Sequence, residues 1–191
     1  IRDETGRTIK LIGQLTNIHH QKLEEDRLRH EASTDLLTQI YNKITTEHLV
    51  SLELQEGRNH ALIVVDLDKF KYANDTFGHL FGDSVIKAVA ATLRATFRAT
   101  DIVGRTGGDE FVVLAKDISL SDGLETLKAK CRRLSVELAH VSLGQDYVIS
   151  ASIGISLFPR DGKTYAELFA KADAALYQIK NTGRGHFAVY G

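Results

Sequence analysis

The sequence predicts an α+β domain with a mostly antiparallel central sheet flanked by helices. Two observations lead to this prediction. Over residues 34–191, short apolar runs alternate with segments that have the periodicity of helices. Two of these runs are separated only by a turn with paired glycines, which favours a hairpin and therefore antiparallel strands. The predicted order is β-α-β-β-α-β followed by one more helix and strand, which is the split β-α-β arrangement.

Residues 1–33 precede this domain and differ from it. Residues 8–18 alternate roughly between apolar and polar types after a turn, which predicts one strand, the last of a domain cut off upstream. Residues 19–33 are rich in charge, lack Gly and Pro, and carry a sparse apolar seam. That pattern predicts a linker helix that could pair with its copy in a dimer.

The first half of the domain contains a helix, a strand and a second helix. Residues 43–56 are helical in pattern, with Asn42 as N-cap and Gly57 just past the end. The run "HALIVVDL", residues 60–67, is continuously apolar and short, as in a buried strand. In residues 82–98 apolar side chains recur at helical spacing behind Asp83, a candidate N-cap.

The second half begins with the hairpin. "DIVGRTGGDEFVVLA", residues 101–115, reads as two strands joined at the glycines. A helix over residues 122–139 follows, in which Asp122 and Glu125 have capping-box spacing, and then a strand over 146–158. Thr164 and Glu167 form a capping box for a last helix that ends at Gly183, before a final strand over 186–191.

Bulk composition narrows the function classes. Of 191 residues, 43% are hydrophobic and 26% charged, an ordinary globular balance, and the net charge of −1 gives no basic field for nucleic acid. The single cysteine, Cys131, excludes an internal disulfide and is typical of a packing residue. No apolar run is long enough to span a membrane. We expect a cytoplasmic fragment of a longer protein, whose other parts could include a membrane anchor.

Acidic side chains gather at one predicted edge of the sheet. Asp66 ends the first strand, and Asp109 and Glu110 occupy the hairpin turn. In a split β-α-β sheet the first strand lies beside the hairpin, so these carboxylates converge, and their repulsion either raises the pKa of one of them or demands a cation. Oxygen ligands without Cys or His suit Mg²⁺ or Mn²⁺. The alternative is an acidic hairpin tip that pairs with Arg105 or Lys116.

Cations and polar groups that suit a nucleotide flank these acids. Lys71, Lys180 and Arg184 could neutralise a triphosphate, since they follow the acidic strand or end the last helix. Asn74 and Asp83 offer an amide and a carboxylate to a base edge. Two alternatives stay open: Asp83 could serve only as an N-cap, and the cations near residue 180 could merely complement the helix dipole.

Four stretches together resemble the GGDEF family of diguanylate cyclases over Thr34 to Gly191. They are "TDLLTQIYNK", "VDLDKFKYANDTFGHLFGD", "GGDEF" at residues 107–111, and "ADAALYQIKNTGRG". The resemblance implies a fold like the polymerase palm and nucleotide cyclases. It also implies condensation of two GTP molecules into cyclic di-GMP and two pyrophosphates across a homodimer. Residues 1–33 resemble the final strand and exit helix of a PAS sensor domain, which would control the cyclase.

The family's site residues transfer onto matching positions. The resemblance implies that Mg²⁺ is held by Asp66, the Leu67 carbonyl, Asp109 and Glu110. Asp109, Glu110 and Lys71 would be catalytic; Asn74 and Asp83 would read guanine; and Lys71, Lys180 and Arg184 would bind the phosphates of GTP. Arg98 and Asp101 match the family's R-x-x-D site, at which the product cyclic di-GMP inhibits. Departures from the family pattern fall at other positions: Leu36, Gln39, Lys43, Thr106 and Gly185.

Two rival functions stay open at this point. The domain could be a non-catalytic receptor that binds cyclic di-GMP through Arg98 and Asp101, although such a receptor need not retain the acids and phosphate cations. It could also be a cyclase for another nucleotide. Asp83 favours guanine, because a carboxylate would meet the acceptor N1 of adenine without a donor.

Overall fold

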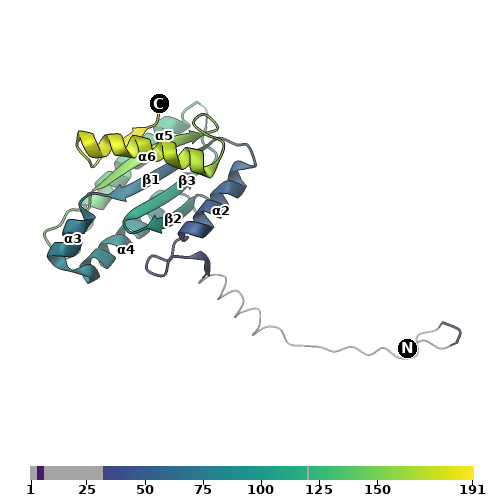
Figure 1. The fold of residues 1–191 in the computed structure, drawn as a ribbon, viewed down its shortest axis with the longest axis horizontal. Coiled ribbons are helices and arrows are strands. Elements are labelled where there is room, and N and C mark those ends of the chain that lie inside the picture. The colour runs from purple at the N-terminus through teal and green to yellow at the C-terminus, as the bar shows by residue number, and fades with distance from the viewer. Residues whose placement is uncertain (1–3, 7–31, 120) are drawn as a thin grey trace. The chain divides into compact units, whose positions relative to one another are not determined.

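A five-stranded sheet forms the centre of the domain in this computed structural model, which describes residues 4–6, 32–119 and 121–191 (Figure 1). The strands are β1 His60–Leu67, β2 Ile102–Gly107, β3 Glu110–Ala115, β4 Ala151–Phe158 and β5 Phe187–Val189. Their order is β2-β3-β1-β4-β5, and only the β4-β5 pair is parallel. The predicted α+β class, the mostly antiparallel sheet and the place of the first strand beside the hairpin are confirmed.

Helices cover both faces of this sheet (Figure 1). The helices are α2 Lys43–Leu54, α3 Phe70–Phe77, α4 His79–Thr96, α5 Gly123–Ala139 and α6 Tyr165–Thr182. Successive strand residues point to opposite faces, so Ile63 and Val65 of β1 join the core formed with α4 and α5. Leu62 and Val64 join the core formed with α2 and α6. Asp66 is the next residue of β1 on the same face as Leu62 and Val64, and it therefore points to the α6 side of the sheet.

Several helix ends are confirmed in detail. The Asn42 side chain accepts a hydrogen bond from the Thr45 backbone N–H at 3.0 Å and caps α2. Thr164 and Glu167 form the reciprocal capping box that starts α6, and Gly183 ends that helix. β1 has the predicted bounds, whereas α2 ends at Leu54, two residues before the predicted end.

The helix after β1 differs from the prediction. An additional helix, α3, occupies Phe70–Phe77, and α4 starts at His79 rather than behind Asp83. Gly78, with φ +85°, separates the two helices and is the N-cap of α4. The expectation that Asp83 caps this helix is therefore wrong, because Asp83 lies within its second turn. Its carboxylate is exposed and free of a capping role.

Two further predictions are corrected. Asp122 stands at the N-cap of α5 but makes no capping hydrogen bond, because its carboxylate accepts one from the Ser121 hydroxyl at 3.2 Å. Residues 146–150, predicted as strand, precede β4 as an irregular segment. The reason is that their partner strand β1 ends at Leu67, which pairs with Ala151.

Most of the predictions for residues 1–33 concern residues that the structure does not describe. The strand expected over residues 8–18 and most of the linker helix over 19–33 lie outside the described residues. Ala32 and Ser33, at the end of the predicted linker, are helical. Within the described residues, no helix combines the length and hydropathy that crossing a membrane requires.

Candidate active site

One cavity of about 240 Å³ opens where β1 ends. Six of the residues predicted for metal and phosphate binding line it: Asp66, Leu67, Lys71, Asp109, Lys180 and Arg184. They come from four places in the chain, namely the end of β1, the first turn of α3, the β2-β3 turn and the end of α6. The sheet order explains this convergence, because β1 lies between β3 and β4 and α6 crosses the same face.

Backbone pairing holds the two acidic segments together. Asp66 lies opposite Glu110 in the antiparallel β1-β3 register, so their side chains project from the same face. One residue further on, the Leu67 N–H donates to the Asp109 carbonyl at 3.3 Å. The hairpin turn is therefore fixed against the end of β1 by main-chain contacts that do not depend on the acidic side chains.

Asp66 is the most constrained of these acids. Lys180 Nζ lies 2.8 Å from Asp66 Oδ1, and both side chains are largely shielded from solvent. Burial raises the pKa of Asp66 above its ordinary value of 3.8, Lys180 opposes that shift, and the charges of Asp109 and Asp68 add to it. Lys180 is therefore the cation in direct contact with Asp66, while Lys69, Lys71 and Arg184 line the same cavity.

The oxygen donors at this site match the coordination preferences of Mg²⁺. Among the described residues no group of three His, Cys, Asp or Glu side chains is arranged to hold a metal. Asp66 and Asp109 are two carboxylates that face one cavity with Leu67. Mg²⁺ in nucleotide sites is commonly held by one or two carboxylates together with substrate phosphates and water. The residues present fit this kind of site.

Glu110 is placed differently from Asp109. Its Oε1 accepts a hydrogen bond from the Thr106 hydroxyl at 2.5 Å, and the residue does not line the cavity. Because Glu110 is the β-sheet partner of Asp66, its carboxylate is still a neighbour of the site. Thr106, one of the departures from the family pattern, thus acts as a hydrogen-bond donor to this acid.

The two predicted base-reading residues lie in α3 and α4, the helices on either side of Gly78, and neither lines this cavity. Asn74 is half-buried in α3, and Asp83 is exposed in α4. A Cβ built on Gly82 would lie 1.9 Å from Asn74 Oδ1. Only glycine at position 82 lets the Asn74 amide lie against α4 beside Asp83, and sequence reasoning had assigned Gly82 no role.

Arg105 contacts the backbone of the hairpin turn. Its Nε and one terminal nitrogen donate to the Gly108 carbonyl at 3.0 and 2.7 Å. The other terminal nitrogen lies 3.1 and 3.2 Å from the two carboxylate oxygens of Asp35. Arg105 therefore pairs with Asp35, at the start of the domain, and Asp109 faces the cavity. The alternative from the sequence, in which Arg105 neutralises the acids of the hairpin tip, does not describe this arrangement.

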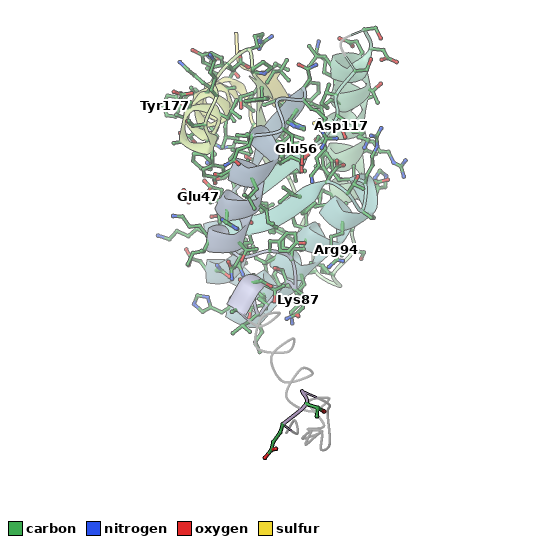
Figure 2. All side chains as sticks on the ribbon, turned by 90° about the vertical axis from the view of Figure 1, so that its right-hand side faces the viewer. Glu47, Glu56, Lys87, Arg94, Asp117 and Tyr177 are labelled. Carbon is green, nitrogen blue, oxygen red and sulfur yellow. The ribbon has the colours of Figure 1, made fainter. Side chains whose placement is uncertain are left out.

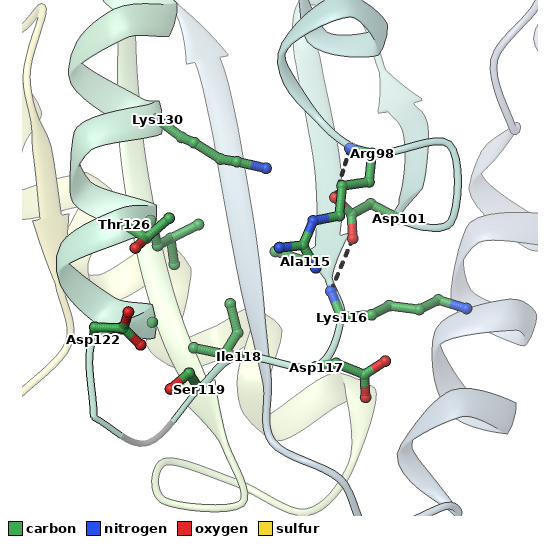
Figure 3. A pocket seen from close by; sticks show the side chains of 12 residues that line it. Arg98, Asp101, Ala115, Lys116, Asp117, Ile118, Ser119, Asp122, Thr126 and Lys130 are labelled. Atoms are coloured by element: carbon green, nitrogen blue, oxygen red, sulfur yellow. Dashed lines mark hydrogen bonds between the residues drawn. The ribbon is translucent and has the colours of Figure 1, made fainter.

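The predicted inhibitory residues line a second cavity of about 210 Å³, away from the first (Figure 3). Asp101 is buried, and its two carboxylate oxygens accept from the backbone N–H groups of Arg98, at 2.8 Å, and Lys116, at 3.0 Å. The Arg98 side chain is left to face the cavity. Lys130 of α5 points into it from the other wall, and no sequence pattern had indicated this residue (Figure 3).

The chain is similar to a known protein family, to curated proteins and to solved structures. Residues 32–186 match the family described as "Diguanylate cyclase, GGDEF domain". The chain is 37% identical over 175 residues to the diguanylate cyclase DgcP of Pseudomonas aeruginosa, covering 89% of this chain and 25% of DgcP. It is 35% identical over 187 residues to the cyclic di-GMP phosphodiesterase PdeR of Escherichia coli, covering 95% of this chain and 28% of PdeR.

Two solved structures have the same fold. The coiled coil and GGDEF domain of DgcB from Caulobacter crescentus, in complex with c-di-GMP, gives a TM-score of 0.81 at 25% identity, covering 90% of this chain and 93% of that one. The GGDEF domain of TpbB from Pseudomonas aeruginosa gives 0.75 at 32% identity, covering 83% and 94%. The chain thus corresponds to about a quarter of each of the two curated relatives and to nearly all of these isolated domains.

Proposed function

Because this chain belongs to the GGDEF family of diguanylate cyclase domains, we propose that residues 34–191 condense two molecules of GTP into cyclic di-GMP and two pyrophosphates. The observation that carries the proposal is the single cavity lined by Asp66, Asp109, Lys71, Lys180 and Arg184. A non-catalytic relative would have no need to keep two carboxylates and three cations on one surface. Family membership alone does not decide the point, since the relatives include proteins named as phosphodiesterases.

In this proposal each residue has a definite task. Asp66, Asp109 and the Leu67 carbonyl hold Mg²⁺, or Mn²⁺ in its place, with Glu110 beside them. The bound ion supplies neutralisation of phosphate charge and alignment of the attacking hydroxyl. Lys71, Lys180 and Arg184 bind the triphosphate, and Lys180 is already positioned by its contact with Asp66.

Base recognition is assigned to the α3-α4 junction. Asn74 and Asp83 hydrogen-bond the guanine edge, with Asp83 accepting from the N1 and N2 hydrogens. The exposed carboxylate of Asp83 and the contact between Asn74 and Gly82 support this assignment. A carboxylate discriminates against adenine because adenine presents an acceptor at N1 and leaves the acid unpaired.

The reaction requires two copies of the domain. Each subunit holds one GTP, and the 3′-hydroxyl of each nucleotide attacks the α-phosphate of the other. A new phosphorus–oxygen bond forms, the bond to the β-phosphate oxygen breaks, and pyrophosphate leaves while the hydroxyl proton passes to a base. Alignment of the two nucleotides across a homodimer is then a main catalytic contribution, and an upstream PAS-like sensor would act by changing that alignment.

A turnover assay tests this function directly. The protein, freed of bound nucleotide, is incubated with GTP and Mg²⁺, and in parallel with ATP and Mg²⁺. We expect cyclic di-GMP and pyrophosphate from GTP alone, and no product after chelation of the metal. If no product forms but cyclic di-GMP binds tightly, the domain is a receptor for cyclic di-GMP and not a cyclase. Equal turnover of ATP would overturn the guanine assignment.

Product inhibition is the second part of the proposal. Arg98, Asp101 and Lys130 would bind cyclic di-GMP in the second cavity and lower the rate. Support comes from two cationic side chains that face one cavity from opposite walls (Figure 3). Asp101 supports Arg98 by accepting its backbone N–H, so the acid shapes the turn that presents the guanidinium.

Arg98→Ala is expected to raise the cyclic di-GMP concentration for half-inhibition by about tenfold, the effect of losing one charge-assisted contact. The initial rate should stay near that of the wild type, because Arg98 is absent from the first cavity. Arg94→Ala is the matched control, since Arg94 is an exposed arginine in the last turn of α4 (Figure 2). Unchanged inhibition in Arg98→Ala would show that this cavity is not the inhibitory site.

A further inference from the structure

Asp68 follows the proposed metal ligand Asp66 by two residues, yet the structure gives it a different environment. The side chain is buried, with 7% of the residue exposed. Ser152 Oγ donates to Asp68 Oδ1 at 2.7 Å, and Ser150 Oγ donates to Oδ2 at 2.6 Å. Within the described residues, no lysine or arginine forms an ion pair with this carboxylate. Neutral donors thus satisfy this buried carboxylate, which also lines the first cavity together with Asp66.

A third donor to Asp68 comes from the loop after α6. The Gly185 backbone N–H donates to Asp68 Oδ2 at 3.0 Å. This bond joins the end of β1 to the residue next to Arg184, one of the three proposed phosphate cations. The two segments are 117 positions apart in sequence, so the contact exists only because α6 returns over the sheet to this edge.

The loop that carries Arg184 includes one non-glycine residue in the left-handed backbone region. Gly183, Arg184 and Gly185 all have positive φ, at +150°, +60° and +67°. A non-glycine residue rarely adopts this conformation without contacts that hold it. The N–H groups of Gly183 and Arg184 donate back to the Ile179 carbonyl of α6. The hydrogen bond from the Gly185 N–H to Asp68 ties the loop to the end of β1.

We propose that Asp68 is a positioning residue that fixes Arg184 relative to Asp66, so that the phosphate cation and the metal-binding acid keep a constant separation. This inference rests on the proposed function, because it takes Arg184 as a ligand for the triphosphate. A role for Asp68 as an additional metal ligand agrees less well with the contacts, since both of its oxygens already accept from three donors.

A double-mutant cycle tests this coupling. The dissociation constant for GTP with Mg²⁺ is measured for the wild type, Asp68→Ala, Arg184→Ala and the double variant. We expect each single variant to bind about tenfold more weakly, and the double variant to bind no more weakly than Arg184→Ala. Asp68→Asn should restore much of the affinity, because its amide oxygen can still accept from Gly185. Additive losses in the double variant would overturn the inference.

A second readout does not depend on the nucleotide. Hydrogen exchange at the Gly185 amide should quicken in Asp68→Ala and stay slow in Ser152→Ala, which removes only the contact to Oδ1. Ser152→Ala serves as the control for lost stability and should bind GTP like the wild type. If the exchange rate of the Gly185 amide is unchanged in Asp68→Ala, the hydrogen bond from Gly185 to Asp68 does not hold the loop. Asp68→Asn is used for this test if the alanine variant does not fold.

The outcomes for the two proposals are distinct. A wild-type protein that binds GTP and shows the coupled cycle but forms no cyclic di-GMP overturns the proposed turnover and supports the role of Asp68. A protein that turns over GTP with additive losses in the cycle overturns the role of Asp68 alone. A wild-type protein that does not bind GTP overturns both.

Discussion

Asp109→Asn is expected to lower the rate of cyclic di-GMP formation on the order of a thousandfold, which is the size of effect seen when one electrostatic contact to a reacting group is removed. Asparagine keeps the shape of the side chain but lacks the negative charge that a divalent cation requires. The main-chain contact between Leu67 and Asp109 is unaffected by this substitution, so the hairpin should stay in place. Initial rates at saturating GTP and Mg²⁺, measured with the thermal unfolding midpoint, check this result.

Glu47→Gln is the matched control for Asp109→Asn. It removes one exposed carboxylate from α2 (Figure 2), and Glu47 is not among the residues that line the cavity. The overall charge changes equally in both variants, so a general electrostatic effect would lower both rates. A near-normal rate in Asp109→Asn would remove Asp109 from the site, and equal losses in both variants would point to a non-specific cause.

Arg105→Ala is expected to lower the free energy of unfolding by about 2 kcal/mol and to lower kcat/KM for GTP at least about tenfold. Its side chain and that of Asp35 are 16% and 25% exposed, so the lost contacts are mostly shielded from water. The reduced activity would arise because the Gly108 carbonyl loses both of its contacts with Arg105 next to Asp109. Chemical denaturation and steady-state kinetics measure the two effects.

Arg58→Ala provides the comparison for Arg105→Ala. Arg58 also contacts several acids, but its side chain is 46% exposed, and ion pairs in such surroundings contribute little. We therefore expect unchanged kinetics and a much smaller loss of stability. Arg105→Lys should fall between the wild type and Arg105→Ala, because one ammonium cannot reach both Asp35 and Gly108 in the planar geometry of a guanidinium. Similar losses from Arg58→Ala and Arg105→Ala would contradict the role of burial.

The contribution of Arg105 should also depend on pH. Burial tends to raise the pKa of Asp35, but hydrogen bonds from Thr38 and Arg105 outweigh it and hold the pKa below 3.8. A lowered pKa in the folded state means that the stabilisation is complete above the ordinary value and is lost as pH falls through the lowered one. The difference in unfolding free energy between wild type and Arg105→Ala should therefore be constant near neutrality and shrink in strong acid.

Much of the fold was predictable because local signals agreed with the final packing. The apolar run from His60 to Leu67 and the capping box of Thr164 and Glu167 specify their elements without help from distant residues. The α3 helix was missed because "FKYANDTF" has only eight residues, half of them polar, and it buries only Ala73. Asp122 has the spacing of a capping box, yet the neighbouring Ser121 hydroxyl binds its carboxylate instead.

Sequence reasoning brought together five residues that line the cavity, but it did not separate them from Glu110, Asn74 and Asp83, which lie outside it, and it gave no supporting contacts. Asp66, Asp109, Lys71, Lys180 and Arg184 were expected together, and they line one cavity. The partners that hold them could not be read from the sequence, since they depend on long-range geometry. Ser150 contacts Asp68 across 82 positions of sequence, and Asp35 contacts Arg105 across 70. Lys130 reaches the second cavity because α5 packs beside α4.

The position of β1 has a consequence for synthesis of the protein on the ribosome. This strand is flanked by β3 and β4, and Ala151, the partner of Leu67, lies in the last quarter of the chain. While the chain is being made, one edge of "HALIVVDL" stays without a partner until β4 has emerged. An apolar strand with an open edge is prone to pair with other chains. Nascent chains halted before β4 should therefore depend on chaperones far more than the finished domain.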